Sequence, residues 1–236
     1  MTKPPLLAVL ITLVSADVAA QEDLFESSMH SAGLSVGIID HRYTGDADVG
    51  GGISYQGPAF GLSYTGPQLR ATGLFTRFDG KHTLINLSGI GWLLPSFTLK
   101  RLDNTIVAVP IGALAAWLRT SGDDGTAPLG TQAVLLGAGG VLEQQLGSRT
   151  VIKLRAMPLA GFTATELTDA LGFSWAADAE ARLEIDQFFS GLGLTIGYIF
   201  RYQVWNVNGS RVLSSLVDEA YDYTSAIHII SAELKF

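Results

Sequence analysis

The sequence predicts an all-β fold, a transmembrane antiparallel up-and-down β-barrel of about ten strands, with eight strands as the alternative. Three observations support this prediction. Of the 236 residues 47% are hydrophobic, yet beyond the N-terminal region no run reaches the roughly 18 apolar residues of a membrane helix. Apolar residues instead recur at alternate positions over many short stretches, which is typical of half-buried strands. The chain also ends on such a stretch, with Phe236 last.

The composition limits the partners and sites that the chain can have. It contains no cysteine, which excludes a disulfide framework and a thiolate metal site. Charged residues make up 16% of the chain and the net charge is −7, so we expect no nucleic-acid partner. The four histidines show no paired metal-binding spacing, and we predict neither a metal nor a cofactor.

Residues 1–20 have the features of a secretory signal peptide. Lys3 supplies the positive charge, and the apolar run 6–14 is followed by small residues before Gln21. We predict cleavage after Ala20, which leaves residues 21–236 as a single barrel domain.

Alternation of apolar and polar residues predicts the strands in order. The fourth strand ends at Pro95 and could instead be a short helix, and 96–103 is expected to be a connection. The predicted strands lie at about 33–43, 51–64, 69–78, 82–94, 104–119, 131–146, 149–163, 171–186, 191–203 and 223–236.

The second predicted strand contains Gly57 and Pro58 between two tyrosines, Tyr55 and Tyr64. An unbroken strand would place these tyrosines on opposite faces, because their spacing is odd. We favour a bulge at Gly57 and Pro58, which would bring both onto the lipid-facing side. The alternative is that each Gly-Pro pair is a turn between very short strands.

The connections predict the orientation in a membrane, since barrels of this kind have short periplasmic turns and longer outer loops. Short turns are expected at 65–68, 147–148 and 186–187, and the segment 96–103 is the exception. The outer loops are expected at 44–50, 79–81, 120–130, 164–170 and 206–222. These loops are acidic. They could bind divalent cations that bridge to lipopolysaccharide, although solvation is the interpretation that we favour.

The closing strand carries a row of apolar residues that ends in Leu234 and Phe236. This pattern resembles the C-terminal signature of bacterial outer-membrane β-barrel proteins, the porin-like barrels of Gram-negative cells. The resemblance implies a place in the cell outer membrane among its lipids and lipopolysaccharide. It also implies insertion by the barrel-assembly machinery, with Leu234 and Phe236 as the assembly signal. His228 interrupts the apolar row, and we expect a local bulge there.

Charged residues of the last strands lie opposite the apolar rows and should point into the barrel. Adjacent strands would place these charges within reach of one another. The barrel interior could select ions or hold a small ligand, but we favour a plug of paired charges, because so small a barrel has little free space. The predicted lumen charge network comprises Lys153, Arg155, Asp178, Glu180, Arg182, Glu184, Asp186, Arg201, Glu233 and Lys235.

These features predict a non-enzymatic barrel that is structural or a narrow passive channel. One alternative is a surface ligand-binding or adhesion barrel that acts through its outer loops. Another is a hydrolase at the outer rim, for which His41 with Asp40, and His82, are the available candidates. No motif surrounds them, so we predict no catalytic residue.

Overall fold

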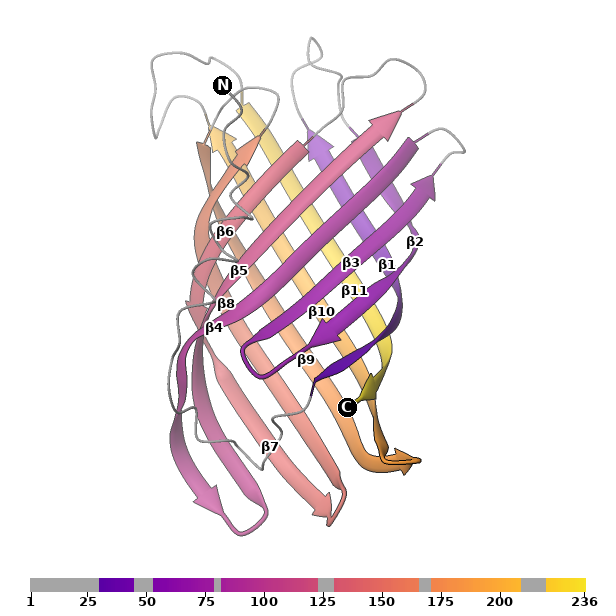
Figure 1. Ribbon diagram of the computed structural model, residues 1–236. Coiled ribbons are helices and arrows are strands. Elements are labelled where there is room, and N and C mark those ends of the chain that lie inside the picture. Colours follow the sequence, from indigo (N-terminus) through magenta and orange to yellow (C-terminus); the bar gives the residue numbers. More distant parts are fainter. Residues whose placement is uncertain (1–29, 45–52, 79–81, 123–129, 166–170, 209–219) are drawn as a thin grey trace, which may run out of the picture.

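The computed structural model describes residues 30–44, 53–78, 82–122, 130–165, 171–208 and 220–236 (Figure 1). These residues form eleven strands and no helix long and apolar enough to cross a membrane. The strands are β1 (Ser31–Thr44), β2 (Ile53–Thr65), β3 (Leu69–Phe78), β4 (His82–Leu102), β5 (Thr105–Gly122), β6 (Gly130–Ala138), β7 (Gly140–Gly147), β8 (Thr150–Thr165), β9 (Leu171–Phe189), β10 (Leu192–Asn208) and β11 (Ala220–Lys235).

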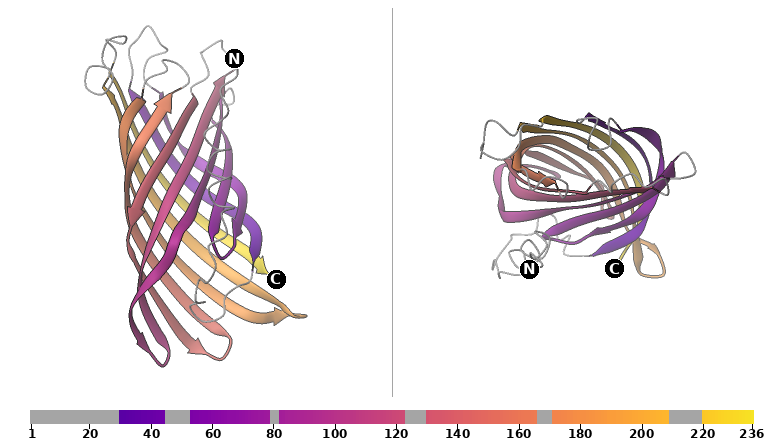
Figure 2. Two further views of the ribbon diagram at one scale, coloured as in Figure 1. Left: turned by 60° about the vertical axis from the view of Figure 1, so that its left-hand side comes forward. Right: turned by 90° about the horizontal axis from the view of Figure 1, so that it is seen from above.

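The strands close into an antiparallel ring, which confirms the predicted barrel. Their order is β4-β3-β2-β1-β11-β10-β9-β8-β6-β5, and the pairing of β4 with β5 completes the circle. β7 continues β6, because both pair with β5 and with β8 and the register is kept across the break between them. The ring therefore has ten strands rather than eight. Its cross-section is oblong when seen from above (Figure 2).

Two prolines explain the division between β6 and β7. The break lies at Gly139, whose N–H donates to the carbonyl oxygen of Pro110 at 3.1 Å. On the other side, the register places Pro158 opposite Ala138. Proline has no backbone N–H to donate, so the ladder loses a donor on each side of the same point.

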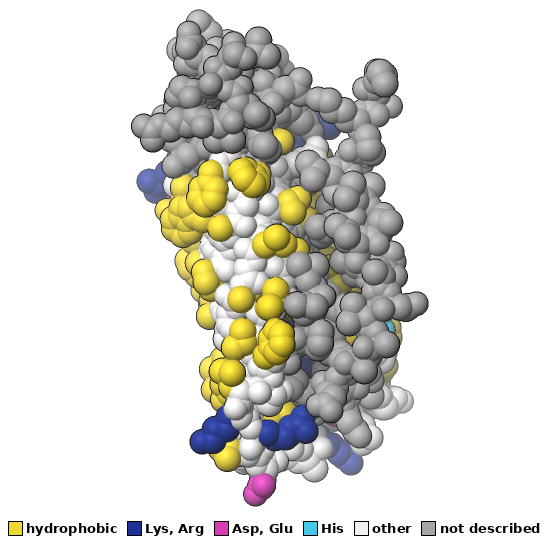
Figure 3. All heavy atoms as spheres, turned by 90° about the vertical axis from the view of Figure 1, so that its left-hand side faces the viewer, with side chains coloured by type: hydrophobic (Ala, Val, Ile, Leu, Met, Phe, Trp, Pro, Cys, Tyr) yellow, Lys and Arg dark blue, Asp and Glu magenta, His cyan; other side chains and the backbone are white. Residues whose placement is uncertain are grey.

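The barrel wall is apolar outside, and its interior contains the buried polar and charged side chains together with apolar ones. Large apolar side chains at outward positions are exposed, among them Leu34, Leu62 and Ile230. Figure 3 shows hydrophobic side chains distributed along the described face, with Lys and Arg side chains near its lower end and at its upper left. Inward positions hold buried Ser, Thr and charged residues. Since such a surface is stable only in lipid, the fold is that of an outer-membrane β-barrel.

The fourth strand is longer than the sequence predicted. We expected a strand over 82–94 and a long connection over 96–103, but β4 runs to Leu102 and turns at 103–104. Three shifts of register between Trp92 and Lys100 let the ladder with β5 continue past Pro95. A bulged strand tolerates proline, so this position does not end it. The connection is therefore a short turn like the others at the periplasmic end.

The turn predicted at 186–187 is also wrong. β9 continues to Phe189, and the turn to β10 is Ser190-Gly191. Ser190 and Gly191 both have positive φ, 47° and 88°, as a two-residue turn between twisted strands requires. Gln187 has a φ of 53° and lies where the register between β9 and β10 shifts, so the irregularity there is a bulge.

The predicted bulge at Gly57 and Pro58 is absent. β1 and β2 pair without a shift of register from one end of β2 to the other. Tyr55 therefore points into the barrel, where it is buried, and Tyr64 lies on the outer face. Gly-Pro does not turn the chain either, because the strand runs through it.

The closing strand pairs with β10 over its whole length and with β1 from Asp222 to Lys235. β11 lies between β1 and β10 without a shift of register, so His228 does not mark a bulge. Its Nδ1 lies 2.8 Å from the hydroxyl of Tyr198, and its ring packs against Phe200 at 4.9 Å between centroids. This hydrogen bond lets a polar side chain face lipid. At the end of the strand, Phe236 and His30 exchange two backbone hydrogen bonds of 2.8 and 3.0 Å.

The predicted signal peptide and most of the predicted outer loops lie outside the described residues. The connections at the periplasmic end are within them, at residues 66–68, 103–104, 148–149 and 190–191. We call the end with these turns the periplasmic end and the opposite one the outer end, following the arrangement of outer-membrane barrels.

Candidate functional site

The main concentration of chemically active groups is a belt of charged side chains inside the barrel. Every residue of the predicted lumen charge network has an inward position, and all but Asp186 are at least four-fifths buried as side chains. The described ion pairs add Arg70 of β3 and Glu143 of β7. The charged belt thus comprises Arg70, Glu143, Lys153, Arg155, Asp178, Glu180, Arg182, Glu184, Asp186, Arg201, Glu233 and Lys235.

Arg70 links opposite walls of the barrel. Its guanidinium reaches Asp178 at 2.6 Å and Glu180 at 2.5 Å, both on β9. β3 and β9 are five strands apart in either direction around the ring, so this contact spans the interior. The side chains of Arg70 and Asp178 are both almost fully buried, with 3% and 1% of their surface exposed. The interior is therefore bridged at this level.

Two other arginines also bind the two β9 carboxylates. Arg201 donates twice to Oδ2 of Asp178, at 2.9 and 2.8 Å. Arg155 donates to Glu180 at 3.0 Å, and its guanidinium lies 4.0 Å from the ring centroid of Trp92. Charge-assisted hydrogen bonds of this kind are stronger than neutral ones, and each of the two carboxylates accepts more than one of them. The arrangement holds the centre of the belt rigidly.

A second group of ion pairs lies nearer the periplasmic end. Lys235 contacts Glu184 at 3.0 Å and Asp186 at 2.8 Å. Glu233 accepts hydrogen bonds from Arg182 at 3.0 Å and from the hydroxyl of Ser31 at 2.5 Å. These contacts join β1, β9 and β11, so the closing strand is fastened to its neighbours by side chains as well as by its backbone.

The charged belt contains as many cations as anions. Six of its residues are Lys or Arg and six are Asp or Glu, so its formal charge is zero. Because its charges are paired with one another, the belt leaves little unbalanced charge to replace the hydration shell of an ion. The arrangement fits a plug better than a selectivity filter.

Sequence reasoning missed Arg70, Glu143 and Trp92. Arg70 and Trp92 occupy inward positions in strands whose two faces we had not separated, although the same alternation would have placed them. The contact of Arg70 with β9 could not be foreseen, because it depends on which strands lie opposite one another in the closed ring.

Apolar side chains fill the rest of the interior. We define the outer apolar cluster as the buried group nearer the outer end of the strands and the middle apolar cluster as the group beside Trp92. The outer apolar cluster comprises Ile39, Tyr55, Ala59, Leu74, Leu84, Ala116, Leu118, Ala133, Ile199, Trp205, Ile227 and Ile229. The middle apolar cluster comprises Ile90, Leu114, Leu135, Met157, Leu159 and Ala176.

The candidate rim residues do not gather into a site. His41 is fully buried inside the wall. The adjacent Asp40 points to the opposite face, where it binds Arg42 at 3.2 Å. His82 lies on β4 and pairs with Phe78 and Gly122. Within the described ranges, no three His, Asp or Glu side chains are grouped as metal ligands.

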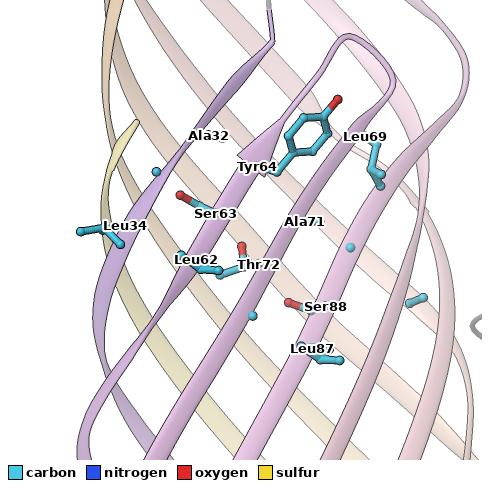
Figure 4. A pocket seen from close by; sticks show the side chains of 14 residues that line it. Ala32, Leu34, Leu62, Ser63, Tyr64, Leu69, Ala71, Thr72, Leu87 and Ser88 are labelled. Carbon is cyan, nitrogen blue, oxygen red and sulfur yellow. The ribbon is translucent and has the colours of Figure 1, made fainter. Parts of the chain in front are cut away.

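An apolar groove lies along the outside of β1–β4, toward the periplasmic end (Figure 4). Its volume is about 730 Å³. Leucines form its sides, and small residues such as Ala71 and Gly73 leave room between them. At its periplasmic end the hydroxyl of Tyr64 lies 2.6 Å from Nδ1 of His30. We call this feature the β2–β3 groove, because it follows the paired part of those strands.

The chain is similar to several solved structures at low sequence identity. The outer membrane protease OmpT from Escherichia coli is 10% identical, with a TM-score of 0.45, over 92% of this chain and 100% of that chain. Ail, the attachment invasion locus protein of Yersinia pestis, is 10% identical with a TM-score of 0.29, over 88% and 99%. The toluene transporter TbuX of Ralstonia pickettii is 10% identical with a TM-score of 0.25, over 88% and 90%. These identities are too low to transfer a function.

No family model matches the sequence, and no curated protein matches it. The class that the fold and the interior define is a small transmembrane barrel of the outer-membrane type.

Proposed function

We propose that this protein is a non-enzymatic outer-membrane barrel whose interior is closed to ions and water-soluble molecules, so that its role is structural. The observation that supports the proposal is the Arg70 contact with Asp178 and Glu180 across the full width of the interior. A channel needs a continuous polar path, whereas here neutralised charges fill the centre. The two apolar clusters occupy the space that the charged belt leaves.

The partners follow from the same proposal. Outer-membrane lipids and lipopolysaccharide would surround the apolar exterior, as they do for any barrel of this class. The barrel-assembly machinery would recognise the closing strand through Leu234 and Phe236, which are 53% and 60% exposed on its lipid-facing row. In this account a closed barrel anchors the outer connections of the chain at the cell surface.

Osmotic swelling of proteoliposomes in small neutral sugars tests the proposal. Vesicles with the wild-type protein should swell no faster than empty vesicles. A variant with Arg70→Ala and Asp178→Ala, which removes the bridge across the interior, should swell faster. The matched control is Arg42→Ala with Asp40→Ala, an exposed ion pair on the outer face, and it should behave as the wild type. Rapid swelling with the wild-type protein would contradict the proposal.

A further inference from the structure

When β6 and β7 are counted as one strand, the ladder between β2 and β3 is the shortest among the described strands of the ring. It has six residue pairs, from Phe60 with Phe75 to Thr65 with Arg70. By comparison, β1 pairs with β2 at thirteen positions and β3 pairs with β4 at ten. Among the described residues, 53–59 of β2 pair with β1 only, and 76–78 of β3 pair with β4 only. We call the boundary between these two stretches the β2–β3 seam.

Pro58 explains why the ladder ends there. The register would next place Ala59 opposite Thr76, and Pro58 opposite Arg77. Pro58 has no N–H for the ladder, and its ring restricts the backbone. The seam thus begins at a position where a continuous ladder cannot form.

Two side chains hold the strands together in place of the ladder. The hydroxyl of Thr76 donates to the carbonyl oxygen of Pro58 at 2.7 Å, and the hydroxyl of Tyr55 donates to the same oxygen at 3.3 Å. The two hydroxyls lie 2.5 Å apart. Tyr55 folds back over Gly57, where a Cβ would come within 2.5 Å of the tyrosine hydroxyl. These contacts form a latch in which Thr76 supplies both cross-strand hydrogen bonds, to Pro58 and to Tyr55, whereas a ladder opens only by breaking many bonds.

The inner side of the seam is mainly apolar, with buried Thr76 and His41, the latter opposite Tyr55, as its polar side chains. Tyr55, Ala59 and Leu74 belong to the outer apolar cluster and lie beside it. Ile39 and Leu84 continue the cluster behind them. The charged belt is held by residues nearer the middle and the periplasmic end of their strands, so hydrocarbon that passed the seam would meet apolar side chains first.

The outer side of the seam adjoins the β2–β3 groove. The groove runs over the paired positions Leu62 with Gly73 and Tyr64 with Ala71 (Figure 4). Phe60 and Phe75 form the next outward pair and are 64% and 51% exposed, so they lie between the groove and the seam. In a bilayer the groove is surrounded by hydrocarbon, and its occupant is therefore a lipid acyl chain.

We propose that the β2–β3 seam is a lateral opening, latched by Tyr55 and Thr76, through which a lipid acyl chain passes from the β2–β3 groove into the outer apolar cluster. This inference goes beyond the closed barrel. Closure to ions depends on the charged belt, while the seam connects two apolar regions and carries no ion. The closed barrel and the lateral opening can therefore be refuted separately. Conductance tests the closed barrel, and lipid access to the interior tests the lateral opening.

Quenching of Trp205 by brominated lipid tests the proposal. Trp205 is buried in the outer apolar cluster, and replacing the other three tryptophans by Phe leaves it as the only tryptophan. The chain has no native cysteine, so Ala59→Cys with Thr76→Cys supplies one disulfide across the seam. The matched control is Ser63→Cys with Thr72→Cys, which lies within the paired ladder. Each protein is placed in phosphatidylcholine vesicles with brominated or ordinary acyl chains.

In the reduced seam variant, brominated chains should lower Trp205 emission, and oxidation of the same sample should remove that loss. Oxidation of the control pair should change nothing. Tyr55→Phe, which removes the tyrosine hydroxyl from the latch, should increase the loss above that of the otherwise unchanged parent. Equal quenching before and after oxidation of the seam pair would overturn the proposal, as would equal effects of the two disulfides. The heat-sensitive migration of each variant confirms that it is folded before the comparison.

Discussion

Arg70→Ala removes the side chain that bridges the interior, and its effect on stability can be worked out from the contacts. The guanidinium is buried and pairs with Asp178 and Glu180. Removing one partner of a buried ion pair costs about 3–5 kcal/mol, because a charge remains without compensation. Here Asp178 keeps Arg201 and Glu180 keeps Arg155, so both carboxylates retain a cation. We therefore expect the low end of that range, about 3 kcal/mol.

The free energy of unfolding can be measured from tryptophan emission during urea titration of the protein in vesicles. Arg42→Ala is the matched control, because this arginine forms an ion pair on the outer face and is 68% exposed as a side chain. An exposed pair contributes about 0–1 kcal/mol. Arg70→Lys should fall between the two, since an ammonium retains the charge without the planar guanidinium. Equal losses for Arg70→Ala and Arg42→Ala would refute the description of the charged belt as a buried network.

Three further predictions concern other parts of the wall. Gly139→Ala should lower the free energy of unfolding by about 1–3 kcal/mol, because its Cβ would lie 2.1 Å from a carbonyl oxygen of β8. Gly140→Ala is the control: open space surrounds that position, so the substitution should be nearly neutral in the same urea titration. Deletion of Phe236 should reduce the heat-modifiable folded protein recovered in the outer-membrane fraction, since this residue closes the β11–β1 pairing; a normal yield would count against that role. Tyr198→Phe should cost about 0.5–1.5 kcal/mol, because it removes the hydrogen bond to His228 at 2.8 Å on the lipid face; no loss would show that His228 needs no partner there.

The alternation of apolar and polar residues predicted most of the fold. A period of two places each side chain on one face, so the inward charges of β8 to β11 could be assigned before the strands were paired. The predictions were wrong at Gly57-Pro58 and at Asp186-Gln187, where local turn signals were given more weight than the alternation. At the first position the strand is continuous, and at the second a bulge replaces the turn.

The candidate site could be predicted only in part, for a physical reason. Neighbouring strands place Arg155 beside Glu180 and Arg182 beside Lys153, and such relations follow from sequence order. Arg70 reaches β9 only because ten strands with their particular tilt bring the two walls within the length of one side chain. The number and the shear of the strands fix that distance, and neither is encoded in a local pattern.

The central claim is that the interior of this barrel is closed by its own side chains. Single-channel recording in planar bilayers tests it most directly, with the wild-type protein reconstituted in its folded, heat-modifiable form. We expect no steady current above that of the bare bilayer, because the charged belt bridges the interior from β3 to β9. A stable ohmic current from the wild-type protein, absent with heat-unfolded protein, would contradict the account.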